Sequence, residues 1–229
     1  MVCNQSGAER ATTRIGTGSL PAERGGFVMK IKMCGMMRAE DIAAVNEIKP
    51  DYIGFVFAKK SRRCISKEKA AELRAALDSD VKAVGVFVNE DVKAVAEFLK
   101  CGIIDIAQLH GSEDNEYILS LKAMTDKPVI KAFRIQTEDD IMPVMESCAD
   151  MVLLDAGAGD GKTFDWSLTG RVTRPYFLAG GLTPENAGEA VKALHPYGLD
   201  VSSGIETDGY KDRTKMAAFK AAAGKEEEK

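Results

Sequence analysis

The sequence has few of the residues that build metal centres and disulfide frameworks. It contains two histidines and five cysteines, and no two cysteines stand in a C-x-x-C spacing. Such a composition argues against a metal site, and an odd number of scattered cysteines argues against a disulfide framework. We therefore expect no metal and a reduced, cytoplasmic protein. The cysteines are Cys3, Cys34, Cys64, Cys101 and Cys148.

The chain also lacks an excess of basic residues and any long apolar run. Its 31 lysines and arginines are outnumbered by 35 aspartates and glutamates, for a formal net charge of -4. This balance provides no basic footprint for nucleic acid, so an anionic ligand has to be held by local backbone amides and a few placed cations. No stretch approaches the roughly 18 apolar residues of a membrane span. We expect neither a nucleic acid nor a membrane as a partner.

Residues 1–28 lack hydrophobic periodicity. Glycine, serine, threonine and scattered arginines fill this stretch, which has no apolar region of the kind found in signal peptides. We predict a disordered or loosely ordered extension, and Met29 is an alternative start of translation. Residues 225–229 are predicted to be a charged tail. The catalytic domain is expected to span residues 29–224.

From residue 29 onward, short apolar runs of strand type alternate with amphipathic segments of helical type. Helix start signals stand at Ser66, Asn89, Ser112, Thr137 and Thr183. The connection between residues 157 and 174 is weak as a helix, and a last helical segment covers residues 211–223. The strand-type runs are residues 29–34, 51–57, 81–88, 103–109, 128–135, 151–155, 175–180 and 198–202.

About eight strand-and-helix units in roughly 200 residues predict a (β/α)8 TIM barrel, because that strand number closes a parallel sheet without leaving edges. An open, doubly wound sheet is the structural alternative. Active sites of barrels lie at the C-terminal ends of the strands. The chemically capable residues fall at those ends: Cys34, the triplet at 61–63, Gln108, His110, Arg134, Asp155, Gly180, Gly181 and residues 202–204.

Two of these residues are candidates for proton transfer. Cys34 ends the first strand, and it becomes a base only as a thiolate, which requires a pKa lowered from about 8.5 by nearby positive charge or amide dipoles. Its alternative role is that of a small apolar core residue. Asp155 ends an apolar strand and suits a general acid or base. Its alternative role is that of a turn residue.

The last two strand ends predict a phosphate site. Gly180, Gly181, Ser203 and Gly204 let backbone N–H groups approach an anion closely, and barrels often bind phosphate after their seventh and eighth strands. Residues 156–163, AGAGDGKT, match a relaxed P-loop pattern. No long helix follows them, however, and a mobile loop covering the site fits the pattern better.

Several motifs together resemble the phosphoribosylanthranilate isomerase family of tryptophan biosynthesis. The resemblance runs from Met29 nearly to the end of the chain. The motifs are KMCG at 32–35, GFVFAKKSRR at 54–63, GVFVN at 85–89, QLHG at 108–111, LLDAGAGDGKTFDW at 153–166, LAGGLTPENA at 178–187 and DVSSGIE at 200–206.

This resemblance implies a (β/α)8 barrel that carries out an Amadori rearrangement without a cofactor. It assigns Asp155 as the general acid, Cys34 as the general base and Arg63 as the ligand of the anthranilate carboxylate. Arg62 stands where the family commonly has proline, so either arginine could hold the carboxylate. The resemblance also places Gln108, His110 and Asp200 near the site.

A second departure from the family is Met36-Met37, which replaces an isoleucine or leucine followed by threonine. Two other functions remain open at this point: a different phosphosugar enzyme on the same barrel, and a non-catalytic barrel that binds a phosphosugar. The residue at position 34 discriminates the first, because related barrels use lysine or paired aspartates. The oligomeric state is left open between a monomer and a homodimer.

Overall fold

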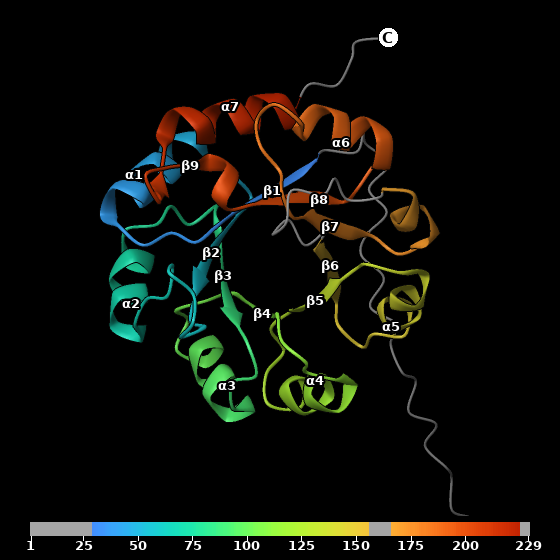
Figure 1. Cartoon of the computed structure of the whole chain (residues 1–229). Coiled ribbons are helices and arrows are strands. Elements are labelled where there is room, and N and C mark those ends of the chain that lie inside the picture. Colours follow the sequence, from blue (N-terminus) through green and yellow to red (C-terminus); the bar gives the residue numbers. More distant parts are fainter. Residues whose placement is uncertain (1–28, 156–165, 225–229) are drawn as a thin grey trace, which may run out of the picture.

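The computed structural model describes residues 29–155 and 166–224 of the chain. Within those ranges, parallel strands pair in chain order and β1 pairs with β8, which closes the sheet into a barrel surrounded by helices (Figure 1). The predicted TIM barrel is confirmed, and the open sheet is wrong. The strands are β1 (Lys30–Cys34), β2 (Tyr52–Val56), β3 (Lys82–Phe87), β4 (Ile106–Leu109), β5 (Val129–Arg134), β6 (Met151–Asp155), β7 (Tyr176–Ala179) and β8 (Gly198–Val201).

Helices connect most of the strands. Two connections are irregular: α5 has five residues with Pro143 in its first turn, where no intrahelical N–H donor is needed, and the weak connection before β7 contains the short 3-10 helix η2. The helices are α1 (Ala39–Ile48), α2 (Lys67–Ala75), α3 (Val92–Lys100), α4 (Asn115–Lys122), η1 (Glu138–Asp140), α5 (Ile141–Met145), η2 (Trp166–Arg171), α6 (Ala187–Leu194), η3 (Ser203–Ile205) and α7 (Arg213–Ala223). A small hairpin of β9 (Glu206–Thr207) and β10 (Tyr210–Lys211) follows η3.

Helix starts were predicted with mixed success. Ser66 caps α2 as predicted, because its hydroxyl accepts a hydrogen bond from a first-turn N–H at 3.2 Å. The predicted caps Asn89 and Ser112 are wrong, since Asp91 and Asp114 cap α3 and α4 instead. Asn89 has a φ of 51° and accepts a hydrogen bond from the backbone N–H of Ser112 at 2.8 Å. An aspartate two residues closer to each helix therefore takes the capping role.

Apolar side chains fill both sides of the barrel wall. Successive strand residues point to opposite faces. On the outside, Phe55 packs with helix residues such as Leu73 in the larger core cluster. On the inside, Val84, Ile130 and Phe177 belong to a separate cluster that plugs the barrel. The barrel interior is thus a packed core, not a pore.

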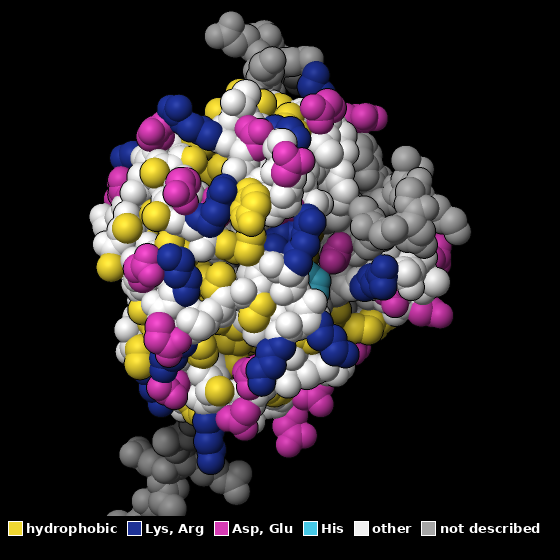
Figure 2. Space-filling model, turned by 60° about the vertical axis from the view of Figure 1, so that its left-hand side comes forward, with side chains coloured by type: hydrophobic (Ala, Val, Ile, Leu, Met, Phe, Trp, Pro, Cys, Tyr) yellow, Lys and Arg dark blue, Asp and Glu magenta, His cyan; other side chains and the backbone are white. Residues whose placement is uncertain are grey.

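Residues 1–28 and 225–229 lie outside the described residues, and the bounds of the barrel domain stay a prediction. Within residues 29–155 and 166–224, none of the helices has the length and apolarity that crossing a membrane requires. On the face seen in Figure 2, lysines and arginines are interspersed with aspartates and glutamates.

Gly204 offers a test of how closely the last loops approach each other. A Cβ at this position would lie 1.9 Å from the carbonyl oxygen of Leu182. We expect Gly204→Ala to lower the free energy of unfolding by about 1–3 kcal/mol, the usual cost of overpacking, as measured by urea denaturation. Gly170→Ala is the matched control, because no heavy atom lies within 4 Å of the added Cβ. Equal stability of the two variants would contradict this close approach.

Candidate active site

A cavity of about 620 Å³ opens at the C-terminal ends of the barrel strands. It is where the strand-end rule placed the candidate site, and it is lined by residues from most of the strands. The predicted site residues that line it are Cys34, Arg63, Gln108, His110, Asp155, Gly180, Gly181, Asp200 and Ser203. Gly204 follows Ser203 and lies against the backbone of Leu182.

Cys34 ends β1 and is buried at the wall of the cavity, with 8% of its surface exposed. Its partner in the parallel ladder is Gly54 of β2. A Cβ at Gly54 would lie 2.5 Å from the Cys34 Sγ. The glycine is therefore what leaves room for the thiol at the strand end.

A buried ion pair lies beside the thiol. Lys32 is fully buried, and its Nζ donates a hydrogen bond to Asp200 Oδ1 at 2.9 Å. The two residues are partners in the ladder between β1 and β8. Our sequence reasoning missed Lys32. The available signal was its position two residues before Cys34, because residues two apart on a strand share a face.

This environment sets the protonation of the thiol. Burial raises the pKa of Cys34, the ammonium of Lys32 opposes the rise, and Asp200 adds to it. Burial would lower the pKa of Lys32, but the charges of Asp200 and Cys34 raise it overall. Cys34 is therefore a thiol in the ligand-free protein, opposite to the lowered pKa that a base at neutral pH requires. The protonated Lys32 nevertheless stabilises a Cys34 thiolate once that thiolate forms.

Asp155 is the end of a row of three polar side chains. The Gln108 Nε2 lies 3.1 Å from the His110 Nδ1, and the His110 Nε2 lies 3.1 Å from the Asp155 Oδ2. Gln108 is buried, and its Oε1 has no hydrogen-bond partner among the described residues. The Gln108 amide nitrogen can only donate, so the His110 Nδ1 accepts, the proton lies on Nε2, and the imidazole donates to the Asp155 carboxylate. The row as it stands therefore suits Asp155 as a carboxylate; accepting from a carboxylic acid requires the Gln108 amide to turn so that its Oε1 faces Nδ1.

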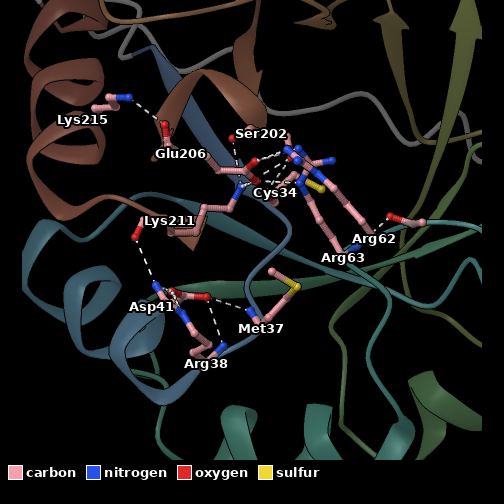
Figure 3. A network of polar contacts seen from close by, with 11 residues as sticks. Cys34, Met37, Arg38, Asp41, Arg62, Arg63, Ser202, Glu206, Lys211 and Lys215 are labelled. Carbon is pink, nitrogen blue, oxygen red and sulfur yellow. Dashed lines mark hydrogen bonds and ion pairs between the residues drawn. The ribbon is translucent and has the colours of Figure 1, made fainter. Parts of the chain in front are cut away.

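Arg63 enters the cavity from the loop after β2 and forms a two-pronged ion pair with Glu206. Its Nε lies 2.6 Å from Glu206 Oε1, and its Nη2 lies 2.9 Å from Glu206 Oε2 (Figure 3). Gly35, with a φ of 89°, permits this path, since a Cβ there would lie 2.4 Å from the Arg63 Cδ. The neighbouring Arg62 also reaches Glu206, but its side chain is 61% exposed, compared with 18% for Arg63. Of the two arginines, Arg63 is the one that lines the cavity.

The loops after β7 and β8 bring glycine backbone to the cavity. Gly180 and Gly181 have φ angles of 93° and 62°, a region that other residues avoid. Asn186 holds this loop, since its Oδ1 accepts from the Thr183 N–H at 2.8 Å and its Nδ2 donates to the Gly181 carbonyl at 3.0 Å. Ser203 lines the cavity from η3. Phosphate binding at these positions stays a prediction.

Two other expectations concern a loop and a metal. The glycine-rich segment 156–163, predicted to cover the site, lies outside the described residues. Across the described ranges, no three histidine, cysteine, aspartate or glutamate side chains are grouped so that they could hold a metal ion.

The fold and the site together define a class of protein. A closed parallel barrel that gathers a thiol, an imidazole, a carboxyl group and a guanidinium at the C-terminal ends of its strands is a (β/α)8-barrel enzyme.

Comparisons with known proteins identify the family. Residues 31–222 match the family model described as N-(5'phosphoribosyl)anthranilate isomerase. The enzyme of that name from Endomicrobium trichonymphae is 45% identical over 192 residues, which cover 82% of this chain and 94% of the relative. The one from Thermoanaerobacter sp. strain X514 is 44% identical over 199 residues, covering 84% and 96%. The chain belongs to the N-(5'-phosphoribosyl)anthranilate isomerase family, as its motifs predicted.

Solved structures agree with this assignment. The phosphoribosyl anthranilate isomerase of Thermotoga maritima superposes with a TM-score of 0.77 at 35% identity, covering 85% of this chain and 98% of that one. A phosphoribosyl anthranilate isomerase in complex with reduced 1-(o-carboxyphenylamino)-1-deoxyribulose 5-phosphate gives a TM-score of 0.75 at 35% identity, with the same coverage. The predicted fold and family are thus confirmed independently of the cavity.

The raised pKa of Cys34 predicts how this thiol reacts in the ligand-free protein. Alkylation by iodoacetamide, followed by mass spectrometry of the Cys34 peptide, should be slower at pH 7 than for an unhindered cysteine and should keep rising above pH 9, because only the thiolate reacts. A maximal rate already at neutral pH would contradict the raised pKa.

The same assay tests Lys32. Replacing the ion pair as a whole, with Lys32→Met and Asp200→Asn, avoids stranding a buried carboxylate. Because Asp200 and Lys32 shift the pKa of Cys34 in opposite directions, the double variant is compared with Asp200→Asn alone. We expect it to alkylate Cys34 several-fold more slowly than Asp200→Asn at pH 8, because the thiolate loses its neighbouring ammonium. Lys82→Met removes an exposed lysine from β3 and serves as the control. Equal rates in the double variant and in Asp200→Asn would show that Lys32 does not stabilise the thiolate.

Proposed function

We propose that this protein converts N-(5-phosphoribosyl)anthranilate into 1-(2-carboxyphenylamino)-1-deoxyribulose 5-phosphate, an Amadori rearrangement in tryptophan biosynthesis. The observation that carries the proposal is the meeting of Cys34, Asp155 and Arg63 at one cavity, although they come from three separate strand ends. An acid, a base and a carboxylate ligand are the groups that this rearrangement requires. The reaction moves hydrogen within one molecule, so it needs no redox cofactor.

Asp155 is proposed as the general acid. As the carboxylic acid it protonates the ribose ring oxygen, and the furanose then opens to an iminium ion. His110 supports this step, because its Nε2 lies 3.1 Å from the Asp155 Oδ2 and, with Nδ1 accepting from Gln108, donates a hydrogen bond that stabilises the carboxylate left after proton transfer. Gln108 contacts the other ring nitrogen and holds the imidazole in place.

Cys34 is proposed as the general base. The iminium ion acidifies the proton on C2 of the sugar, and the sulfur takes that proton to leave an enolamine, which tautomerises to the ketone. The buried pair of Lys32 and Asp200 provides the positive charge next to the thiolate. Because the resting group is a thiol, it has to release its own proton to solvent in the cavity before the sulfur can take the C2 proton; the positive iminium ion and the Lys32 ammonium favour that release, whereas a nearby anion opposes it.

The two anionic ends of the substrate are assigned to different loops. Arg63 is proposed to hold the anthranilate carboxylate, because a guanidinium fork matches a carboxylate and the side chain lines the cavity. The phosphate is assigned to the backbone N–H groups of Gly180, Gly181, Ser203 and Gly204.

We expect a monomer or a homodimer that works in the cytoplasm. One structural relative is described as monomers generated from a dimeric enzyme.

The test follows the loss of anthranilate-type fluorescence when the purified protein meets phosphoribosylanthranilate generated in situ. Cys34→Ala and Asp155→Asn should each lower kcat about 10²- to 10⁴-fold, the usual contribution of positioned proton transfer, and leave the folded state intact by circular dichroism. Cys101→Ala removes an exposed thiol at the end of α3 and should keep full turnover.

Wild-type turnover in either site variant would overturn the role given to that residue. An inert wild type that still binds the phosphosugar would overturn the reaction itself, leaving a different phosphosugar enzyme or a binding protein.

A further inference from the structure

Glu206 lies at the centre of a cluster of three cations. Its carboxylate accepts from Arg62 Nη2 at 2.6 Å, from Arg63 Nε at 2.6 Å and from Lys211 Nζ at 2.7 Å (Figure 3). The Glu206 side chain is only 4% exposed, and that of Lys211 is fully buried. Sequence reasoning assigned no role to either residue.

The chain places Glu206 and Lys211 together by a short hairpin. The two residues are partners in the antiparallel ladder of β9 and β10. The connecting residues, Asp208 and Gly209, have φ angles of 53° and 84°, which suit the tight turn that an Asp-Gly pair favours. The hairpin therefore places Glu206 beside Lys211, which binds its carboxylate together with Arg63.

The contact with Glu206 uses only one edge of the Arg63 guanidinium. Nε and Nη2 bind the two carboxylate oxygens, and Nη1 has no hydrogen-bond partner among the described residues. A guanidinium carries five N–H donors in one plane, so gripping one edge fixes the direction of the other. Because Arg63 lines the cavity, the remaining donors, on Nη1 and the second hydrogen of Nη2, are left for a carboxylate that enters it.

The charges of the cluster do not cancel. Burial opposes ionisation of Glu206, yet hydrogen bonds from Arg63 and Lys211 hold its pKa at about 2, so it is a carboxylate at neutral pH. One carboxylate against three cations leaves a surplus of two positive charges. Lys211 also donates to the Ser202 carbonyl at 2.9 Å, and the Ser202 hydroxyl donates to the Cys34 carbonyl at 3.0 Å. The cluster is thus connected to the end of β1.

We propose that Glu206 is a positioning residue for substrate recognition. It binds Nε and Nη2 of the Arg63 guanidinium and so orients the remaining N–H donors toward the aryl carboxylate of the substrate. This proposal rests on the proposed function. The positive charge that the cluster leaves on Arg63 at the cavity then matches the aryl carboxylate. A glutamate that merely stabilised the β9–β10 hairpin would affect all ligands of the cavity alike.

Two ligands separate these roles. One is reduced 1-(2-carboxyphenylamino)-1-deoxyribulose 5-phosphate, and the other is the same compound without the ring carboxylate. Titration calorimetry measures the affinity of both for wild type, and the ratio of the two affinities reports the contribution of the carboxylate alone. We expect a ratio of at least about 30 in wild type, the order of one charge-assisted bidentate contact.

Glu206→Gln should lower that ratio at least fivefold and leave the affinity for the ligand without the carboxylate within threefold of wild type. Glu206→Asp keeps the charge but withdraws it by one methylene, and should lower the ratio by a smaller factor. The matched control is Glu138→Gln, which removes an exposed carboxylate of η1 that pairs with Arg171 of η2, and it should change neither affinity.

The outcomes are separable. An unchanged ratio in Glu206→Gln, or equal losses of affinity for both ligands, would overturn the positioning role. If Glu206→Gln does not fold, an unchanged ratio in Glu206→Asp overturns it instead. A wild type that binds both ligands equally would instead refute the assignment of Arg63 to the carboxylate, and a wild type without turnover would refute the proposed reaction.

Discussion

The ladder between β1 and β8 is the contact on which the rest of the structure depends. It joins the first strand to the last and converts a sheet with two open edges into a barrel. The same ladder pairs Lys32 with Asp200, residues 168 positions apart, and so builds the ion pair beside the Cys34 thiol. Closure of the barrel therefore also brings the two charges together beside Cys34, the proposed base, because neither strand alone carries both.

Charge is distributed unevenly around the cavity. The pair of Lys32 and Asp200 is balanced, whereas the cluster around Glu206 keeps two excess positive charges. Buried ions are costly unless they are paired, so a cavity wall with more cations than carboxylates is suited to an anion that arrives later. The raised pKa of Cys34 agrees with the proposed reaction: the resting site holds a neutral thiol, and the positive iminium ion formed after ring opening favours proton transfer.

The sequence predicted the architecture and the residues at the strand ends, because strand periodicity and the barrel rule act locally. Cys34 and Asp155 were found in this way. Lys32, Glu206 and Lys211 were missed for a physical reason: a lysine inside a strand or a glutamate after a loop is usually solvated, and only long-range pairing reveals that these are buried. The predicted helix starts at Asn89 and Ser112 were wrong because a second residue able to cap the helix, an aspartate, follows two positions later. The motifs resembling a known family supplied the reaction, which no periodicity could.

The most direct test of the account is a crystal structure of this protein with reduced 1-(2-carboxyphenylamino)-1-deoxyribulose 5-phosphate. The account predicts the aryl carboxylate at about 3 Å from the Arg63 guanidinium, with Glu206 still bound to its Nε and Nη2. The phosphate should lie on the backbone of Gly180, Gly181 and Ser203, and C2 of the sugar next to the Cys34 sulfur. A ligand bound in the reverse direction, with its phosphate on Arg63, would contradict the assignment of every group in the site.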